Sequence, residues 1–173
     1  KLGKLNKAIR ERADNIISNG YLVLLGDANG ADRAMQKYLA EKSYLHVLIF
    51  CAGNSCRNNI GRWETRLIPV NRAHKDFQCY AIRDEKMSDE ADYGFMVWDG
   101  KSKGTLNNIM NLLELNKPVL VYFYPKRKFF TLKSYRGLAE IMSFCAREDL
   151  ERLEKSLRIS QRIHPEQSRL HFA

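Results

Sequence analysis

The chain has 173 residues, enough for one domain with a full hydrophobic core and too few for two. Hydrophobic residues make up 45% and charged residues 28%; no run approaches the ~20 apolar residues of a membrane-spanning helix, and we expect a cytoplasmic globular protein without a signal peptide rather than a membrane protein. The net charge of +9 would suit an anionic partner such as a nucleotide, a polyphosphate or nucleic acid.

The first part of the chain alternates helical and strand patterns. Apolar residues at helical spacing predict an amphipathic helix from Leu5 to Ile17. The wholly apolar run Tyr21–Leu25 predicts a central parallel strand. A turn at 26–32 leads into a helix that reaches about Lys42, and His46–Cys51 is predicted to be a further strand.

A long segment from Ala52 to Asp76 shows no regular pattern and is rich in Asn and Arg. Long irregular loops often carry function, so its amides and guanidinium groups, beside Trp63, could read or stack on a base. An insertion that covers a sheet edge is the alternative. We then predict a short strand at Gln78–Ile82 and one or two helical turns at Arg83–Glu90.

The segment from Ala91 to Tyr122 has the pattern of a strand–loop–helix–strand unit. The hydrophobic run that ends at Trp98 is followed by Asp99-Gly100, a loop through Thr105 and a helix with apolar residues at helical spacing. Free backbone N–H groups and the helix dipole at such a helix start favour an anion, for example a nucleotide phosphate.

The last part of the chain predicts strands at Val119–Phe123 and Lys128–Leu132 and helices at Ser134–Cys145 and Glu148–Arg162. Alternating strands and helices predict an α/β fold, a three-layer Rossmann-like sandwich with a mainly parallel sheet. We expect a single domain over 1–173 with a helical extension at 147–173. Because a helix comes first, we expect the first strand of such a fold to precede the sequence given.

Two turns carry the candidate ligand-binding residues. Glycines at the end of a strand let the backbone approach a phosphate or ribose closely, and a carboxylate at the helix start can accept ribose hydroxyls. A tight turn with a capping Asp is the alternative for the first turn. If both turns end strands of one parallel sheet, they converge on one crevice. The residues concerned are Gly26, Asp27, Gly30 and Asp32 in the first turn and Asp99, Gly100, Gly104 and Thr105 in the second.

Arg83 is a further candidate, because a guanidinium at a helix start could bind a phosphate through two hydrogen bonds. The alternative is an exposed helix on which Arg83 or Lys86 pairs with acidic neighbours. Much of the excess positive charge lies in Lys126-Arg127-Lys128 and between Arg147 and Arg169, where a solvated helix face is the simpler interpretation for the last helix.

The four cysteines have no zinc-ribbon or redox CxxC spacing. Cys51 and Cys56 could form half of a metal site, but there is no second pair and no His at ligand spacing. We therefore predict free, buried or half-buried thiols at Cys51, Cys56, Cys79 and Cys145, and neither a metal nor a cofactor.

These motifs resemble those of the SLOG superfamily of Rossmann-like proteins, which includes the LOG phosphoribohydrolases and the DNA-processing protein DprA. GDANGADRA, at 26–34, is similar to the GGxxGAD turn of that group. The spacing from Arg83 through Met87, Ala91-Asp92 and Asp99-Gly100 to Gly104-Thr105 is similar to the LOG pattern R-x-x-x-M, A-D, P-G-G-x-G-T-x-x-E. The resemblance spans 19–123 and implies a nucleotide ligand and a homo-oligomer, commonly a dimer.

The chain departs from the LOG pattern at two positions. Asn108 stands where the family has the acidic residue that handles the ribose and supports N-glycosidic cleavage, and Asp99 stands where it has Pro, in a loop one residue longer. An amide can hydrogen-bond hydroxyls but cannot act as a base or stabilise an oxocarbenium ion as a carboxylate does. The same objection applies to a likeness to nucleoside deoxyribosyltransferases.

Four hypotheses follow. The leading one is a nucleotide-binding protein of the SLOG type, such as a nucleotide sensor. The second is an N-glycosidic hydrolase of nucleoside monophosphates, with Asp32, Asp99 or Asn108 as catalytic candidates and Asp27 as a further substitute for the missing Glu. The third is a DprA-like nucleic-acid-binding module. Two features of the sequence argue against it: the positive charge is scattered, and no aromatic stacking platform is evident. The fourth is a degenerate scaffold that serves oligomerisation.

Overall fold

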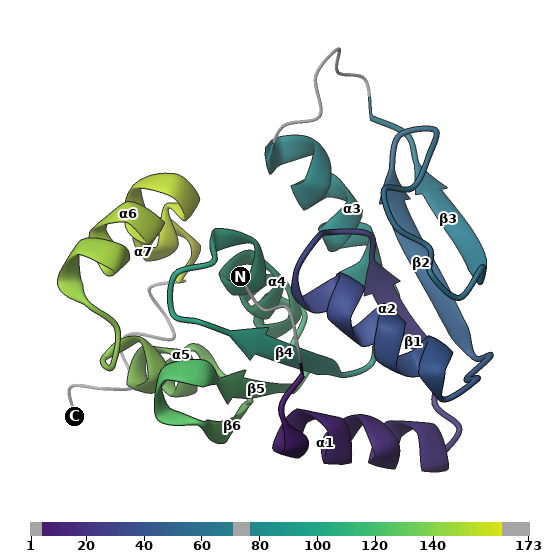
Figure 1. Ribbon diagram of the computed structural model, residues 1–173. Coiled ribbons are helices and arrows are strands. Elements are labelled where there is room, and N and C mark those ends of the chain that lie inside the picture. The colour runs from purple at the N-terminus through teal and green to yellow at the C-terminus, as the bar shows by residue number, and fades with distance from the viewer. Residues whose placement is uncertain (1–4, 71–76, 164–173) are drawn as a thin grey trace. The chain divides into compact units, whose positions relative to one another are not determined.

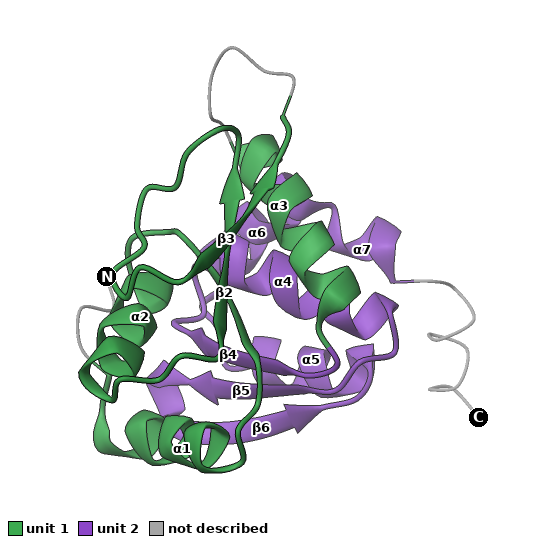
Figure 2. Cartoon of the chain, turned by 90° about the vertical axis from the view of Figure 1, so that its right-hand side faces the viewer, with its two compact units in different colours: residues 1–91 green, residues 92–173 purple. Residues whose placement is uncertain are grey.

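The computed structural model describes residues 5–70 and 77–163. It divides into two compact units, 1–91 and 92–173, shown in green and purple in Figure 2. Each unit is a small α/β assembly, so the predicted α/β class is confirmed (Figure 1). The single domain expected from the sequence stays a prediction. Among the described residues, no helix is both long and apolar enough to cross a membrane.

The first unit contains a three-stranded parallel sheet in the order β1-β2-β3. Its elements are α1 (Lys7–Ser18), β1 (Val23–Gly26), α2 (Ala31–Glu41), β2 (Val47–Ala52), β3 (Glu64–Ile68) and α3 (Phe77–Glu90).

Strand β2 forms the centre of this sheet, and all its residues are buried. Val47, Ile49 and Cys51 face a hydrophobic cluster that includes Leu39 of α2. Residues of a strand alternate between its two faces. The other β2 residues therefore face away from this cluster, and α3 also packs against β2. Within this sheet β1 lies at an edge and is half-buried, so the prediction that it is central is not met here.

Two predictions for the first unit were wrong. Gln78–Ile82 is not a strand but belongs to α3, which runs unbroken from Phe77 and places Arg83 in mid-helix. A four-residue apolar run does not distinguish a strand from a buried helix turn. The irregular stretch before it contains β3, an edge strand whose side chains are mostly exposed and therefore show no apolar alternation. Part of that stretch, 71–76, lies outside the described residues.

The second unit contains a mixed sheet in the order β4-β5-β6, in which β5 is fully buried. Strands β4 and β5 are parallel and joined through α4, whereas β6 pairs with β5 in the antiparallel sense after a 3-10 turn, η1. The elements are β4 (Gly94–Trp98), α4 (Lys103–Glu114), β5 (Val119–Phe123), η1 (Tyr124–Lys126), β6 (Lys128–Leu132), α5 (Tyr135–Met142), α6 (Arg147–Leu157) and α7 (Ile159–Arg162).

The polar helix predicted at Glu148–Arg162 is divided in two. Arg158 takes a left-handed conformation (φ 50°) that ends α6 and starts α7. Arg162 then fixes α7 to α4, because its guanidinium donates to both carboxylate oxygens of Glu114 (2.8 and 2.9 Å) and to the amide oxygens of Asn107 and Asn111. Residues 164–173 of the expected helical extension lie outside the described residues.

Candidate functional site

The turn after β1 brings five predicted residues to the carboxyl end of that strand. Gly26 ends the strand, and a Cβ there would lie 2.5 Å from Oδ2 of Asp32 and 3.1 Å from Cζ of Arg83. A larger residue at this position would therefore have to displace the Asp32 side chain. Gly30 caps α2 with a φ of 120°, a conformation that also favours glycine. The sequence thus located this turn correctly, but the close approach at Gly26 is made by side chains of the protein itself, and the approach of a ligand there stays a prediction.

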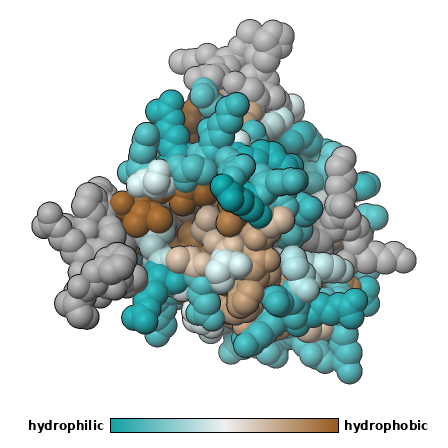
Figure 3. Space-filling model, turned by 90° about the vertical axis from the view of Figure 1, so that its left-hand side faces the viewer, coloured by the Kyte–Doolittle hydropathy of each residue, from teal (hydrophilic) through white to brown (hydrophobic). Residues whose placement is uncertain are grey.

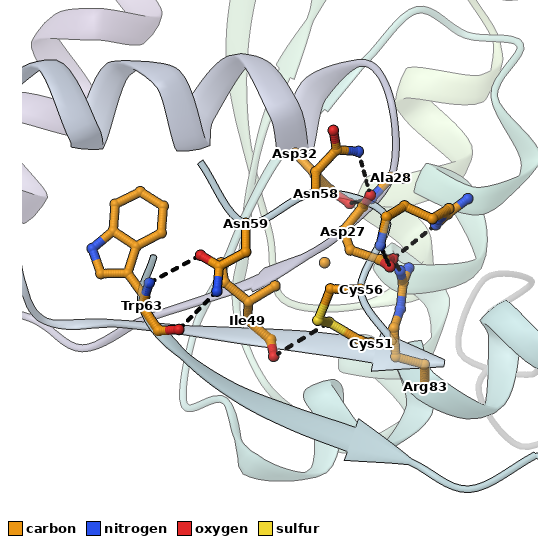
Figure 4. Close-up of a disulfide and its surroundings, with 12 residues drawn as sticks. Asp27, Ala28, Asp32, Ile49, Cys51, Cys56, Asn58, Asn59, Trp63 and Arg83 are labelled. Carbon is orange, nitrogen blue, oxygen red and sulfur yellow. Dashed lines mark hydrogen bonds and ion pairs between the residues drawn. A yellow bond between two sulfur atoms is a disulfide. The ribbon is translucent and has the colours of Figure 1, made fainter. Parts of the chain in front are cut away.

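Asp27 is the centre of the site, with 1% of its surface exposed. Its carboxylate accepts a hydrogen bond from Nη1 of Arg83 (2.6 Å), which lies beside it in Figure 4. It also accepts hydrogen bonds from Nη2 of Arg57 (2.8 Å) and from the backbone N–H of Arg57 (2.9 Å). Burial would raise the pKa of Asp27, but the hydrogen bonds and charges of the two arginines outweigh it and lower that pKa. Asp27 is therefore an ionised, fully engaged anchor.

Asp32 lies in the first turn of α2, as predicted, and its Oδ2 accepts the backbone N–H of Ala28 (3.1 Å). Desolvation by burial raises the pKa of its carboxyl, and the nearby charge of Arg83 only partly offsets this. Two neighbouring carboxyls, Asp27 and Asp32, thus have pKa values displaced in opposite directions, an arrangement found at acid–base sites.

Arg83 is 3% exposed and is held by acidic side chains. Its Nε donates to Oδ1 of Asp84 (2.8 Å), Nη2 donates to the same oxygen, and Nη1 donates to Asp27. Burial would lower the pKa of Arg83, but Asp84, Asp32 and Asp27 together raise it. Of the two interpretations offered by the sequence, pairing with an acidic neighbour is what the structure contains, although on a buried helix face and not an exposed one.

Arg57 is the accessible cation of this group, with 32% of its side chain exposed. Its guanidinium lies 4.0 Å from the ring centroid of Tyr80, which holds it by a cation–π contact beside Asp27. We refer to Asp27, Asp32, Arg57, Arg83 and Asp84 as the Asp27 cluster. It combines three acidic groups with two guanidinium groups, one of them within reach of solvent.

Gln36, which no sequence motif pointed to, ties the turn to the segment that follows β2. It is fully buried, and its amide donates to the carbonyl of Gly26 (2.9 Å) and accepts the N–H of Ile60 (3.1 Å). Asn58 adds a second link, since its amide donates to the carbonyl of Asp27 (2.7 Å). These amides fasten the Asn-rich segment onto the turn, a role for which the only sequence signal was the density of Asn and Arg.

The prediction of four free thiols was wrong for one pair. Cys51, at the end of β2, and Cys56 form a disulfide with Cα atoms 5.1 Å apart, whereas Cys79 and Cys145 are free. A backbone turn at 53–55 brings the two Cβ atoms together, and spacing alone does not reveal such a turn. Because Arg57 follows Cys56 directly, the disulfide anchors the segment that binds Asp27.

The second predicted turn, in the other unit, forms the cap of α4. Oδ1 of Asp99 accepts the N–H groups of Lys101 (2.9 Å) and Ser102 (2.8 Å), and the Ser102 hydroxyl caps the helix at Thr105. Gly100 has a φ of 79° and packs against Phe123 and Cys145. A Cβ on Gly104 would meet open space. Asn108 lies one turn further along α4 and is half-buried.

The predicted site residues therefore form two groups. Gly26, Asp27, Gly30, Asp32 and Arg83 come together within the first unit, and the remainder line the start of α4 in the second. The convergence of the two turns on one crevice stays a prediction. In the described parts of the chain, no group of three or more His, Cys, Asp or Glu could hold a metal ion.

The second unit also contains an apolar cavity of about 320 Å³, lined by residues of α5, α6 and α7 that include Leu138, Met142, Leu150 and Ile159, and by Ile163 directly after α7. Figure 3 shows a face on which hydrophobic residues gather among hydrophilic ones. None of the predicted site residues lines this cavity.

Comparisons with protein-family models, with curated proteins and with solved structures found no match to this chain. The resemblance to the SLOG superfamily therefore stays a prediction.

Proposed function

We propose that this protein binds a nucleoside phosphate, as the SLOG proteins that it resembles do, and serves as a nucleotide sensor. The observation that carries the proposal is the Asp27 cluster, which lies at the carboxyl end of a parallel strand and at the start of α2. Ligands of open α/β sheets bind at such strand ends. A three-layer Rossmann-like sandwich, a homo-oligomer and a cytoplasmic location belong to the same proposal; a disulfide in that compartment would be a reversible one.

The chemistry of the cluster fits a phosphorylated sugar. The carboxyl of Asp32, which lies against Gly26, can hydrogen-bond ribose hydroxyls. Arg57 is the group proposed to bind the phosphate, because it is partly exposed, whereas the donors of Arg83 are directed at Asp27 and Asp84. This reassigns the phosphate contact from Arg83, where the sequence placed it, to Arg57.

The test is a thermal-shift and calorimetric screen of nucleoside mono-, di- and triphosphates, free nucleosides and inorganic phosphate. We expect a nucleotide to raise the melting temperature of the wild type, and Arg57→Ala to abolish that shift. Arg66→Ala is the matched control, because Arg66 lies on the same segment, pairs with Glu90 and is outside the cluster. If no nucleotide stabilises the wild type, or if the control loses the shift equally, the proposal fails.

The displaced pKa of Asp32 favours a second candidate, N-glycosidic hydrolysis of a nucleoside monophosphate. A carboxyl whose pKa is raised by desolvation holds its proton more tightly and is better suited to protonate a leaving base as a general acid. Released base would be measured by chromatography after incubation with a nucleotide that binds. Asp32→Asn should abolish release, with Asp99→Asn as the comparison, and Asn108→Glu should increase release if the carboxylate of the LOG pattern is what the chain lacks.

A further inference from the structure

The positive charge of the second unit is concentrated in one part of it. Residues 92–173 contain fourteen Lys and Arg against nine Asp and Glu, a net charge of +5. Residues 115–139 alone contain six Lys and Arg and no acidic residue, so the rest of the unit has a net charge of −1. These six cations are Lys117, Lys126, Arg127, Lys128, Lys133 and Arg136. From the sequence, this charge was expected to be scattered.

The structure places phenylalanine rings beneath two of these cations. Nζ of Lys126 lies 4.7 Å from the ring centroid of Phe144, and Nζ of Lys128 lies 5.4 Å from that of Phe130. The two rings are neighbours, with centroids 6.1 Å apart. Lys128 and Phe130 are two residues apart on β6 and therefore share a face of this edge strand. We call Lys126, Lys128, Phe130 and Phe144 the aromatic–basic surface.

The ring of Phe144 is accessible, with 43% of the residue exposed. Arg127, between the two lysines, is exposed as well. The acidic groups that act on the adjacent Cys145 are Asp99 and Asp149. Asp149 is paired with Lys101 and Arg152, and Asp99 accepts backbone N–H groups. Among the described residues, Lys126 and Lys128 form no ion pair with a carboxylate, and both side chains are exposed to solvent.

We propose that the aromatic–basic surface binds single-stranded nucleic acid. The exposed ring of Phe144, bordered by cations, matches the way such strands are held, with bases stacked on aromatic side chains and phosphates paired with Lys and Arg. A duplex offers its phosphates to the lysines, but its bases are stacked inside the helix and cannot stack on Phe144. An acidic peptide would pair with the lysines and would make no use of the aromatic ring. A single strand is therefore the occupant that uses both features. On binding, a base would stack on the Phe144 ring in place of the Lys126 ammonium, and that ammonium would then pair with a phosphate.

This inference does not rest on the proposed nucleotide site. It uses no residue of the Asp27 cluster, and its readout is an oligonucleotide titration and not a shift caused by a mononucleotide. Either proposal can therefore fail while the other holds.

The test is a fluorescence-anisotropy titration of the whole chain with labelled thymidine and uridine homopolymers of about 20 nucleotides, longer than a typical single-strand site. We expect binding at about 50 mM salt that weakens steeply toward 200 mM. Lys126→Ala/Lys128→Ala should reduce the slope of log affinity against log salt by about 1.4, since each lost phosphate contact to a single strand is worth about 0.7. The control is Lys37→Ala/Lys155→Ala, which removes the same two positive charges at exposed lysines outside the aromatic–basic surface. Its slope should stay close to that of the wild type, apart from the small effect of the lower net charge.

A second pair of variants isolates the ring. Phe144→Leu preserves apolar packing but removes stacking and should lower affinity about ten-fold, whereas Phe144→Trp should retain or improve it. The melting temperature of each variant shows that it is folded. The proposal is overturned if the wild type does not bind at low salt, if the control double variant loses as much as Lys126→Ala/Lys128→Ala, or if duplex DNA or polyglutamate competes as well as the single strand.

Discussion

Asp32 is the residue whose environment opposes its ordinary ionisation. Its folded pKa is raised by burial, so the folded state binds the proton more tightly than the unfolded state does. By linkage, the stability that this group contributes is present below its unfolded pKa of about 3.9 and is lost as the pH rises through the folded value. A charged Asp32 therefore destabilises the protein at neutral pH.

We predict that Asp32→Asn raises the free energy of unfolding at pH 7, because the amide removes the desolvated charge and its oxygen can still accept the N–H of Ala28. The gain should shrink as the pH falls toward 4. Urea denaturation at several pH values measures it, and Asp27→Asn is the contrasting variant. Asp27 has a lowered pKa, so its contribution is present above pH 4 and lost in acid, and its replacement should destabilise at pH 7. A pH-independent effect of Asp32→Asn would contradict the argument.

Two glycines predicted to bind ligand differ in what a methyl group would meet. At Gly26 the new Cβ would clash with Asp32, so Gly26→Ala should cost about 1–3 kcal/mol of stability. At Gly104 it would meet open space in the first turn of α4, so Gly104→Ala should stabilise by about 0.5–1 kcal/mol. Chemical denaturation measures both. If Gly104→Ala is stable yet loses a nucleotide-induced thermal shift, the start of α4 approaches the ligand; an unchanged shift would remove Gly104 from the site.

At the scale of elements, the disulfide and the segment that follows it act together. Cys51 closes a short loop with Cys56, and the next residue provides three of the contacts around Asp27 and Tyr80. A closed loop of about six residues is worth about 2 kcal/mol through the entropy of the unfolded chain.

We therefore predict that a reductant lowers the free energy of unfolding by about 2 kcal/mol. Urea denaturation with and without dithiothreitol measures the difference. Cys51→Ala/Cys56→Ala is the control, and its stability should not respond to the reductant; a response there would point to Cys79 or Cys145 instead.

The elements that the sequence predicted well are those whose pattern is set by burial. The fully apolar β2 and β5 and the amphipathic α1 and α4 were found within a few residues of their ends. The edge strand β3 was missed because its side chains face solvent. Within the site, the turn chemistry of Gly26 and Asp32 was readable, since it is local. Two other features depend on how the chain returns to β1 after β2, which no local pattern encodes. They are the disulfide between Cys51 and Cys56 and the hydrogen bond from Arg57 to Asp27.

At the scale of the whole molecule, the net charge of +9 affects stability and binding with opposite sign. Repulsion among like charges destabilises a compact state. Salt shortens the Debye length from about 30 Å at 0.01 M to about 8 Å at 0.15 M and so relieves this repulsion. Salt also weakens the attraction between the protein and a polyanion. Binding releases counterions from the polyanion, and the entropy gained by this release is smaller when the solution already contains more salt.

We predict that the urea midpoint rises between about 10 and 150 mM NaCl, a range over which the Debye length falls below the size of the chain, while the affinity for a single-stranded oligonucleotide falls. Exposed ion pairs such as Lys7–Glu11 oppose the rise only weakly, since such pairs contribute at most about 1 kcal/mol. Lys126→Ala/Lys128→Ala lowers the net charge by two and should reduce both salt dependences, whereas Lys37→Ala/Lys155→Ala should reduce only that of stability. Equal effects of the two double variants on oligonucleotide affinity would show that net charge, and not the aromatic–basic surface, attracts the strand.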